Sequence, residues 1–156
     1  MTEIRFATHA DAVSIAAVLH DSFIEYEKSY TSDGFAATTP SAEQIQNRMD
    51  EGPIWVVMSE GAAVGTVSVV ARGESLYIRG MAVLPPARGQ HVGESLLQHV
   101  EQFAHANGFR RLCLSTTPFL LRAIRLYERM GFTKIAEGPH DLFGTPLFTM
   151  EKRLAV

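Results

Sequence analysis

The chain has 156 residues, of which 46% are hydrophobic and 20% charged, as expected for one globular domain that can bury a core. A formal net charge of −3 at pH 7 gives no electrostatic basis for binding nucleic acid. One cysteine excludes an internal disulfide and a cysteine-rich metal site, and no apolar run reaches the roughly 20 residues of a membrane span.

The first third of the chain is predicted to hold a strand and two helices. The run "EIRFAT" (3–8) predicts a short strand, and Thr8 with Asp11 forms a capping box that starts a helix. The polar, turn-rich segment "EKSYTSDGFAATTP" (27–40) predicts an ordered loop. Ser41 and Gln44 form a second capping box, which predicts a helix to about Met49. Apolar residues of the first helix recur at helical spacing, at Ile15, Leu19, Phe23 and Tyr26.

Three β-rich runs follow in the middle of the chain. They are "IWVVMS" (54–59), "AAVGTVSVVA" (62–71) and "SLYIRGMAV" (75–83), and the short turns between them predict an antiparallel meander. Pro85 and Pro86 end the last strand, because proline provides no ladder donor. A helix is predicted over 92–107, with Gly108 as its stop. Its apolar face is Val92, Leu96, Leu97, Val100, Phe103 and Ala104.

The last third is predicted to be a strand, a helix and two further strands. The strand "RRLCLST" carries Cys113, which is predicted to be a buried structural thiol. The helix "PFLLRAIRLYERM" ends at Gly131, and "FTKIAEG" and "PLFTMEKRL" complete the set. No repeat or linker divides the chain, so residues 1–156 are predicted to form one α/β domain. Its sheet is expected to be mostly antiparallel, with a parallel pair on either side of the 92–107 helix.

The turn "RGQHVG" (88–93) precedes that helix and is a candidate phosphate cradle. Helix N-termini leave about four backbone N–H groups unpaired and carry partial positive charge, which suits a phosphate. Gly89 and Gly93 would let backbone and ligand approach closely, and Arg88 adds a cation. A surface turn whose glycines serve conformation alone explains this hexamer equally well, because glycine spacing is a weak signal.

Other nucleotide, hydrolase and metal sites lack their signatures. The chain has no G-x-x-x-x-G-K-[ST] string, no Rossmann fingerprint in its first βα turn and no G-x-S-x-G elbow. His91 and His99 would lie about 12 Å apart along one helix, too far to share a metal ion. No metal site is therefore expected.

Three segments together resemble the GNAT superfamily of acyl-CoA-dependent N-acyltransferases. They are "YIRGMAVLPPARGQHVGESLL", "RRLCLSTT" and "LLRAIRLYERMGF". The family's signature is a strand ending in V-x-P, then R-G-x-G-x-G opening a helix, and later A-x-x-L-Y-x-x-x-G-F. Two positions depart from this pattern: His91 replaces the middle glycine, and Leu120 replaces a frequent asparagine. The matching residues are Val83, Pro85, Arg88, Gly89, Gly93, Ala123, Leu126, Tyr127, Gly131 and Phe132.

The resemblance implies a fold and a coenzyme site. The fold is α/β (α+β), with a mixed, mostly antiparallel seven-stranded sheet flanked by about four helices. Acetyl-CoA would be the co-substrate, its pantetheine arm pairing with the 81–83 strand and its pyrophosphate held by the amides of 88–93. The coenzyme-binding residues expected on this basis are Met81, Ala82, Val83, Arg88, Gly89, Gln90, His91, Val92 and Gly93.

The resemblance also implies an activity: transfer of an acetyl group from acetyl-CoA to a primary amine of a small molecule or peptide, by direct attack on the thioester. Tyr127 matches the family's tyrosine and is the candidate general acid for the leaving thiolate. On its spacing alone it would be an aromatic core residue. The general base stays open among Glu25, Tyr26, Glu74, His140 and Asp141. The segments "FIEYEKSYTSDGF" and "GPHDLFGTP" are expected to form the acceptor pocket, with contacts from Glu25, Tyr26, Tyr30 and His140.

Two competing functions remain at this level. One is a non-catalytic acyl-CoA-binding sensor or interaction module, and the other is a scaffold without a ligand. Neither nucleic acid nor a membrane is an expected partner, and a cytoplasmic location is the default expectation. Dimers are common among proteins of this kind, so a homodimer is compatible with the sequence, although no stretch demands one.

Overall fold

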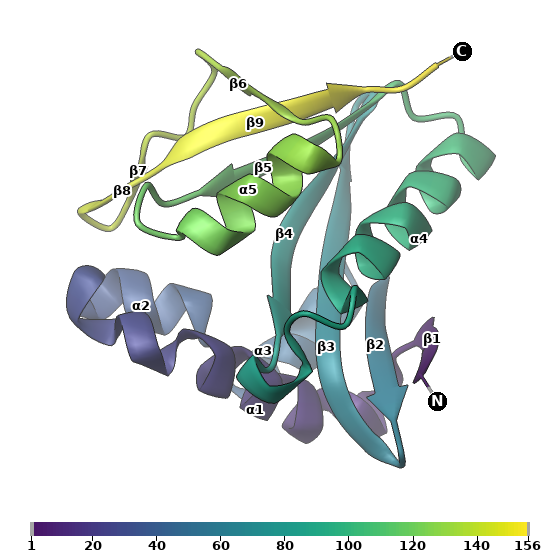
Figure 1. The fold of residues 1–156 in the computed structure, drawn as a ribbon, viewed down its shortest axis with the longest axis vertical. Coiled ribbons are helices and arrows are strands. Elements are labelled where there is room, and N and C mark those ends of the chain that lie inside the picture. Colours follow the sequence, from purple (N-terminus) through teal and green to yellow (C-terminus); the bar gives the residue numbers. More distant parts are fainter. Residues whose placement is uncertain (1, 156) are drawn as a thin grey trace.

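The computed structural model describes residues 2–155, which form nine strands and five α-helices (Figure 1). Short 3-10 helices precede α1 at His9–Asp11, follow it at Ile24–Ser29 and occupy Pro85–Ala87. The α-helices are α1 (Ala12–Phe23), α2 (Ser32–Thr38), α3 (Ala42–Met49), α4 (Val92–Ala106) and α5 (Leu121–Arg129). The strands are β1 (Thr2–Phe6), β2 (Ile54–Ser59), β3 (Ala62–Arg72), β4 (Ser75–Val83), β5 (Arg111–Thr116), β6 (Thr133–Ile135), β7 (Asp141–Leu142), β8 (Thr145–Pro146) and β9 (Phe148–Arg153).

Seven of these strands form one sheet in the order β1-β2-β3-β4-β5-β9-β6. Every neighbouring pair is antiparallel except β4 and β5, which run parallel on either side of α4. The predicted mixed, mostly antiparallel seven-stranded sheet is therefore confirmed, with five flanking helices rather than about four. The remaining strands, β7 and β8, form a separate two-stranded hairpin.

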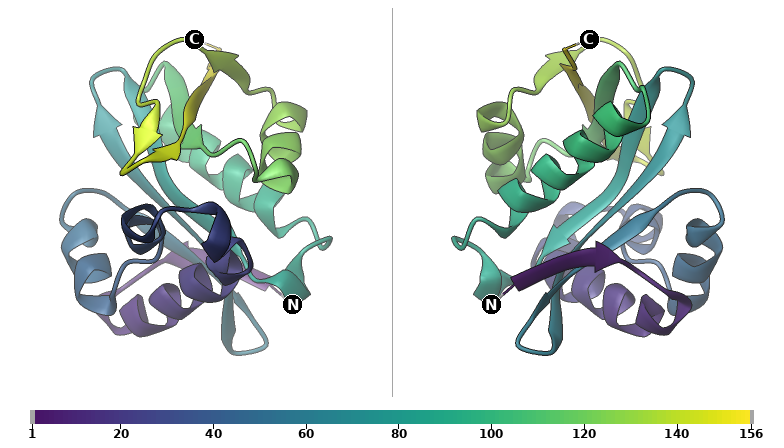
Figure 2. Two further views of the ribbon diagram at one scale, coloured as in Figure 1. Left: turned by 90° about the vertical axis from the view of Figure 1, so that its left-hand side faces the viewer. Right: turned by 90° about the vertical axis from the view of Figure 1, so that its right-hand side faces the viewer.

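Helices cover both faces of the sheet, α1 and α3 on one and α4 and α5 on the other (Figures 1 and 2). The apolar residues of β2 supply the cores on both of these faces, because successive side chains of a strand point to opposite faces of the sheet. Trp55 and Val57 join the core beneath α4, whereas Ile54 and Val56 join the core beneath α1 and α3. The predicted apolar face of α4 is buried as expected, with Leu96, Val100 and Ala104 fully enclosed.

The prediction of an ordered loop over 27–40 is wrong, because α2 lies within it. This helix begins at Thr31, whose Oγ1 accepts a hydrogen bond from the N–H of Gly34 at 3.0 Å. The same Thr31 hydroxyl lies 3.1 Å from Oγ1 of Thr145, in the β7–β8 hairpin region. Glycine and threonine are weak helix formers, so α2 depends on tertiary contacts that a local pattern does not reveal.

Both capping boxes form at the predicted positions. Asp11 accepts from the N–H of Thr8 at 2.8 Å and also binds the guanidinium of Arg5, with Nη1 and Oδ2 2.8 Å apart. Ser41 and Gln44 exchange reciprocal bonds at the start of α3. These contacts fix the residues at which the helical segments of α1 and α3 begin.

A bulge in β4 opens the sheet. Ile78 pairs with Val69 and Gly80 with Ser68 on β3, so Arg79 is an extra residue in the ladder. The parallel pairing of β4 with β5 ends at the same place, at Ile78 and Leu114. A bulge bends its strand and ends regular pairing, so β4 beyond Ile78 separates from β5. The backbone of Met81–Val83 therefore faces the resulting gap with no strand paired on that side.

Candidate functional site

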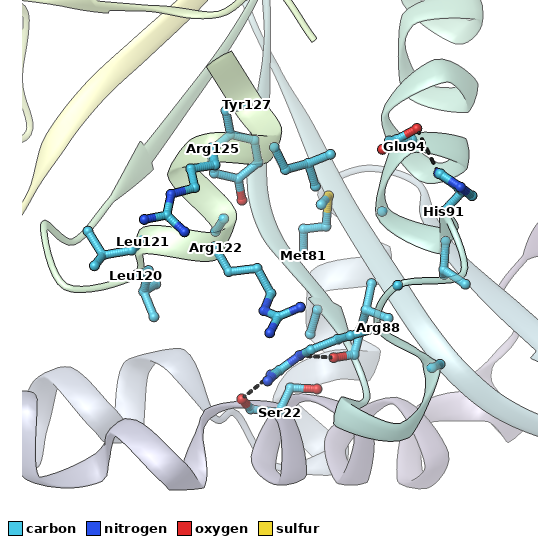
Figure 3. Close-up of a pocket in the computed structure, with 18 of the residues that line it drawn as sticks. Ser22, Met81, Arg88, His91, Glu94, Leu120, Leu121, Arg122, Arg125 and Tyr127 are labelled. Carbon is cyan, nitrogen blue, oxygen red and sulfur yellow. Dashed lines mark hydrogen bonds and ion pairs between the residues drawn. The ribbon is translucent and has the colours of Figure 1, made fainter. Parts of the chain in front are cut away.

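A cavity of about 710 Å³ lies between the end of β4, the start of α4 and the inner face of α5 (Figure 3). Its lining includes most of the residues expected to bind the coenzyme. Gln90 is the exception, since it does not line the cavity and its Nε2 donates to the carbonyl of Pro86 at 3.4 Å. The expected residues in the lining are Met81, Ala82, Val83, Arg88, Gly89, His91, Val92 and Gly93.

The N-terminus of α4 supplies backbone donors to this cavity. The N–H of Ser95 donates to the carbonyl of His91 at 3.0 Å and is the first bond of the helix, so the preceding amides have no partner within it. Among these amides, those of Val92 and Gly93 belong to residues in the cavity lining. Partial positive charge at the same end of the helix adds to the attraction for an anion.

His91 occupies the left-handed region of backbone space, with φ 62° and ψ 21°. This conformation explains the glycine that the family pattern favours there, since a β-carbon is strained at positive φ. Histidine is among the residues that tolerate it best. The imidazole is 78% exposed and its Nδ1 lies 3.2 Å from Oε2 of Glu94 (Figure 3). The side chain is thus held at the rim while its backbone remains in the turn.

Gly93 packs closely against a side chain of α5. A β-carbon at this position would lie 2.7 Å from Cδ2 of Leu126, so the start of α4 rests directly against α5. Gly89 differs, because a β-carbon there would meet nothing within 4 Å while its φ is 85°. Conformation therefore explains Gly89, and the approach of two helices explains Gly93.

Arg88 is engaged by the protein itself. Its guanidinium donates to Oε1 of Glu25 at 2.6 Å, to the carbonyl of Ser22 at 3.1 Å and to the carbonyl of Val83 at 3.3 Å. These bonds tie the end of α1 to the end of β4. Arg88 and Glu25, expected to contact coenzyme and acceptor respectively, therefore bind each other.

Sequence reasoning missed a second set of cations. Arg122, Arg125 and Arg129 of α5 all line the cavity, at the i, i+3 and i+7 spacing of one helix face. Arg122 extends from α5 toward the Arg88 side of the cavity (Figure 3). Arg129 is partly engaged, because its Nη2 donates to Oε1 of Glu94 at 3.2 Å. The repeated arginines of "LRAIRLYER" were the signal available in the sequence.

Tyr127 lies on the inner face of α5 and is only 7% exposed. Burial raises the pKa of its phenol to about 12, with a smaller contribution from the nearby Tyr30. The hydroxyl points toward the cavity (Figure 3). Tyr127 is thus both a core residue, packed with Phe132 at a ring separation of 6.0 Å, and part of the cavity wall.

A second cavity, of about 300 Å³, also has Tyr127 in its lining. It lies beside the gap where β4 and β5 part, and α1, α2, α3 and the 142–147 region contribute to its wall. The two cavities share four lining residues: Phe23, Met81, Leu120 and Tyr127.

The other proposed acceptor residues are distributed unevenly. Tyr30 lines the second cavity and Tyr26 the first, and both rings pack on Phe119, at 4.9 Å and 6.1 Å. Glu25, Glu74, His140 and Asp141 line neither cavity. Glu74 instead lies 3.7 Å from Nε of Arg110, and Asp141 accepts from the N–H of Gly144 at 3.0 Å.

Within residues 2–155, no group of three or more His, Cys, Asp or Glu side chains is arranged to hold a metal ion. No helix in the same range combines the length and the apolar character needed to cross a membrane. Cys113 is buried in β5, as predicted.

Comparisons with known proteins agree with this geometry. The model of the acetyltransferase (GNAT) family matches residues 16–132. The chain is 30% identical over 139 residues to the uncharacterized N-acetyltransferase YjgM of Escherichia coli (strain K12). The aligned region covers 85% of this chain and 82% of that relative. It is 32% identical over 85 residues to the N-acetylaspartate synthetase of Danio rerio. Here the aligned region covers 53% of this chain and only 30% of that longer relative.

Solved structures show the same fold. The PaiA N-acetyltransferase from Thermoplasma acidophilum, determined in complex with coenzyme A, superposes with a TM-score of 0.85 at 16% identity, over 99% of both chains. Ard1 from Thermoplasma volcanium gives 0.82 at 21% identity, again over 99% of both chains. The family model matches most of the chain, and the structure has the turn with free amides and the separated pair of strands. This chain therefore belongs to the GNAT family of acetyl-CoA-dependent N-acetyltransferases.

Proposed function

We propose that this enzyme transfers an acetyl group from acetyl-CoA to the primary amine of a small molecule or peptide, with Tyr127 as the general acid. One observation carries the proposal. Tyr127 is among the four residues that line both cavities, so its phenol stands where a coenzyme in the first cavity would meet an acceptor in the second. The alternative of a non-catalytic acyl-CoA-binding module gives no reason for a second cavity at this junction.

The first cavity fits coenzyme A in shape and charge. The unpaired edge of β4 at Met81–Val83 suits an extended pantetheine arm, which would add to the sheet as a strand does. The free amides of α4 suit a pyrophosphate. Arg122 and Arg125 provide positive charge from the facing helix. Arg88 adds little positive charge to the cavity, because it is already paired with Glu25. Acetyl-CoA bound there would supply the activated acetyl thioester.

The chemistry requires two proton movements. An amine with a pKa near 10 must lose a proton to attack, and the departing sulfur must gain one. A phenol is protonated at neutral pH, and burial, which raises the pKa of Tyr127 to about 12, keeps this proton in place at alkaline pH as well, so the phenol is available as a donor. A backbone N–H at the open edge of β4 is placed to stabilise negative charge on the acetyl oxygen.

The base is proposed to be solvent water. Among residues 2–155, those that line the second cavity include no Asp, Glu or His, so none of them offers the acceptor a carboxylate or imidazole base. Water that enters the cavity can receive the proton as the C–N bond forms and the C–S bond breaks. On this account the reactive fraction of the amine, set by its own pKa, limits the rate at low pH.

An acceptor panel tests the proposal. Purified protein is incubated with acetyl-CoA and a set of primary amines, amino acids and short peptides, and free thiol is measured together with the acetylated product by mass spectrometry. Calorimetry with acetyl-CoA is run in parallel. Binding without transfer to any acceptor would support the non-catalytic alternative, and absence of binding would contradict both.

A further inference from the structure

The second cavity is positively charged, which is unexpected for a site that receives an amine. Three arginines line it: Arg48 from α3, Arg72 from β3 and Arg79 from β4. Its lining within residues 2–155 includes no aspartate or glutamate. Arg72 is already engaged, since its guanidinium carbon lies 4.0 Å from the centre of the Tyr77 ring. Arg48 and Arg79 are the two whose guanidinium N–H groups are least engaged by the protein.

Arg79 has hydrogen-bonding capacity that the protein does not use. Its Nη1 donates to Oε2 of Glu51 at 2.7 Å. Its Nε and Nη2 are buried and have no hydrogen-bond partner anywhere in the described part of the chain. Buried donors on a cation are costly to leave unpaired, and most such groups in proteins meet an acceptor. Arg79 is also the bulged residue of β4, so it lies where that strand turns away from β5.

Arg48 adds a second charge beside the first. Burial lowers the pKa of its guanidinium, and the positive charge of Arg79 lowers it further, against a smaller opposite effect of Glu51. Its Nη2 makes one long bond, to the carbonyl of Ala37 at 3.4 Å. Its Nη1 lies 4.0 Å from the point that a β-carbon on Gly80 would occupy. Glu51, whose side chain is 56% exposed, is thus paired with Arg79 and acts on Arg48 only as a nearby negative charge.

We propose that the acceptor is an amine that carries a carboxylate, namely a free amino acid, and that Arg79 and Arg48 bind its carboxylate. The inference rests on the proposed function, because it assigns the second cavity to the acceptor. A planar guanidinium matches a carboxylate with two parallel hydrogen bonds. The unpaired Nε and Nη2 of Arg79 are buried, so we expect its side chain to shift when they bind the carboxylate. The amine then points toward Tyr127, at the boundary with the first cavity.

The rest of the cavity agrees with an acceptor of this size. Its volume of about 300 Å³ is at the lower end for ligand sites, which suits a single amino acid better than a longer peptide. Apolar side chains from three segments complete its wall and would contact the acceptor's side chain: Leu19, Phe23, Leu142 and Leu147. A cationic polyamine would meet repulsion from both arginines.

The test compares each of the twenty amino acids with its own amide as acceptor. The two members of a pair share the side chain and the amine, and only the acid presents an α-carboxylate. Amidation lowers the pKa of the amine, so a preference for the acid cannot arise from amine availability. We expect kcat/KM to favour the best acid over its amide by about ten- to a hundredfold, the range of a charge-assisted hydrogen bond.

Arg79→Gln and Arg48→Gln should reduce kcat/KM for the acid by a similar factor while leaving the amide nearly unchanged, so that the preference disappears. Arg110→Gln is the matched control, because Arg110 is 64% exposed and lines neither cavity. Equal rates for acid and amide, or an equal loss for both in Arg79→Gln, would overturn the inference. A higher kcat/KM for an aminoalkylphosphonate than for the amino acid would show that the site recognises a phosphonate, and would overturn the assignment of a carboxylate.

A binding measurement separates this inference from the proposed function. Thermal stabilisation of the coenzyme A-loaded protein is recorded with each N-acetyl amino acid and with the corresponding N-acetyl amide. Stabilisation by the acids that Arg79→Gln abolishes supports carboxylate recognition even where no transfer is detected. If acetyl transfer to amines is detected but the N-acetyl amino acids stabilise the protein no more than their amides do, the proposed function is retained and carboxylate recognition is rejected.

Discussion

The guanidinium of Arg88 and the carboxylate of Glu25 form an ion pair with an N–O distance of 2.6 Å, and the same guanidinium donates to the carbonyl of Ser22. The pair joins residues at the end of α1 to the turn that precedes α4. Both partners are thus held in place beside the first cavity. Two consequences can be tested, one for catalysis and one for stability.

Glu25→Gln should leave the pH dependence of kcat/KM unchanged, because a carboxylate bound to Arg88 does not serve as the base. A general base normally contributes about 10²–10⁴-fold, so a loss of that size would contradict this expectation. Arg88→Met, which keeps the apolar stem, should lower the free energy of unfolding by about 1–3 kcal/mol. Denaturant unfolding of both variants gives the comparison.

Tyr127→Phe should reduce kcat by about a hundredfold or more while the Kd for acetyl-CoA changes less than about twofold. The ring and its packing are retained, and only the proton donor is removed. Single-turnover kinetics excludes product release as the slow step. Tyr30→Phe is the comparison variant, because it removes a neighbouring buried phenol that lines only the second cavity and should change the KM for the acceptor rather than the chemical step. Equal effects of the two variants on the chemical step would reject the assignment of the acid.

The pH profile of the enzyme should rise with pH through the pKa of the acceptor amine and show no decline from Tyr127 below about pH 10. The reason is that the folded enzyme holds this phenol neutral, with a pKa of about 12. The unfolded chain ionises it near pH 10, so its contribution to stability is complete below pH 10 and is lost as the pH rises through about 12. Unfolding of Tyr127→Phe should therefore be less sensitive to alkali than that of the parent protein.

His91→Gly should leave the affinity for acetyl-CoA within about threefold of the parent value, since the turn keeps its backbone N–H groups. Glycine also relieves the left-handed backbone at φ 62°, and this gain offsets the greater entropy of glycine in the unfolded chain. Thermal unfolding and calorimetry measure both quantities. A collapse of binding would show that the imidazole, 78% exposed beside Glu94, is itself needed.

Asp11→Asn should lower the free energy of unfolding by about 1–2 kcal/mol at pH 7, through loss of the Arg5 ion pair and a weaker cap. The hydrogen bonds from Arg5 depress the pKa of this carboxyl to about 2, below its ordinary value of 3.8. The stabilisation is therefore present above pH 3.8 and is lost as the pH falls through about 2. The difference between the parent and the variant should shrink as unfolding is repeated at lower pH.

Arg122→Gln should weaken acetyl-CoA binding severalfold and reduce its dependence on salt, because Arg122 faces the cavity and forms no ion pair with a carboxylate of residues 2–155. Arg153→Gln, on the far strand β9 and 78% exposed, is the control for a loss of charge alone. Identical salt dependence in the two variants would argue against a phosphate contact at Arg122.

Features of short range could be predicted from the sequence. The capping boxes at Thr8 and Ser41, the meander from Ile54 and the helix over 92–107 depend on residues a few positions apart, and the structure has all of them. The family could also be identified, because its motifs lie within single turns and helices. Helix α2 could not, since its glycine and threonines have low helix propensity and are held by contacts with the 143–145 turn.

The sequence by itself thus determined most of the order of elements, the mixed seven-stranded sheet and the turn at 88–93 that precedes α4, because hydrophobic periodicity and caps act locally. Only the tertiary structure decided which charges meet. It paired Arg88 with Glu25 across 63 positions of the chain and set Arg48 beside Arg79 between a helix and a bulged strand. Such pairings follow from the bend and twist of the sheet, which bring distant residues to one cavity, and no local pattern encodes them.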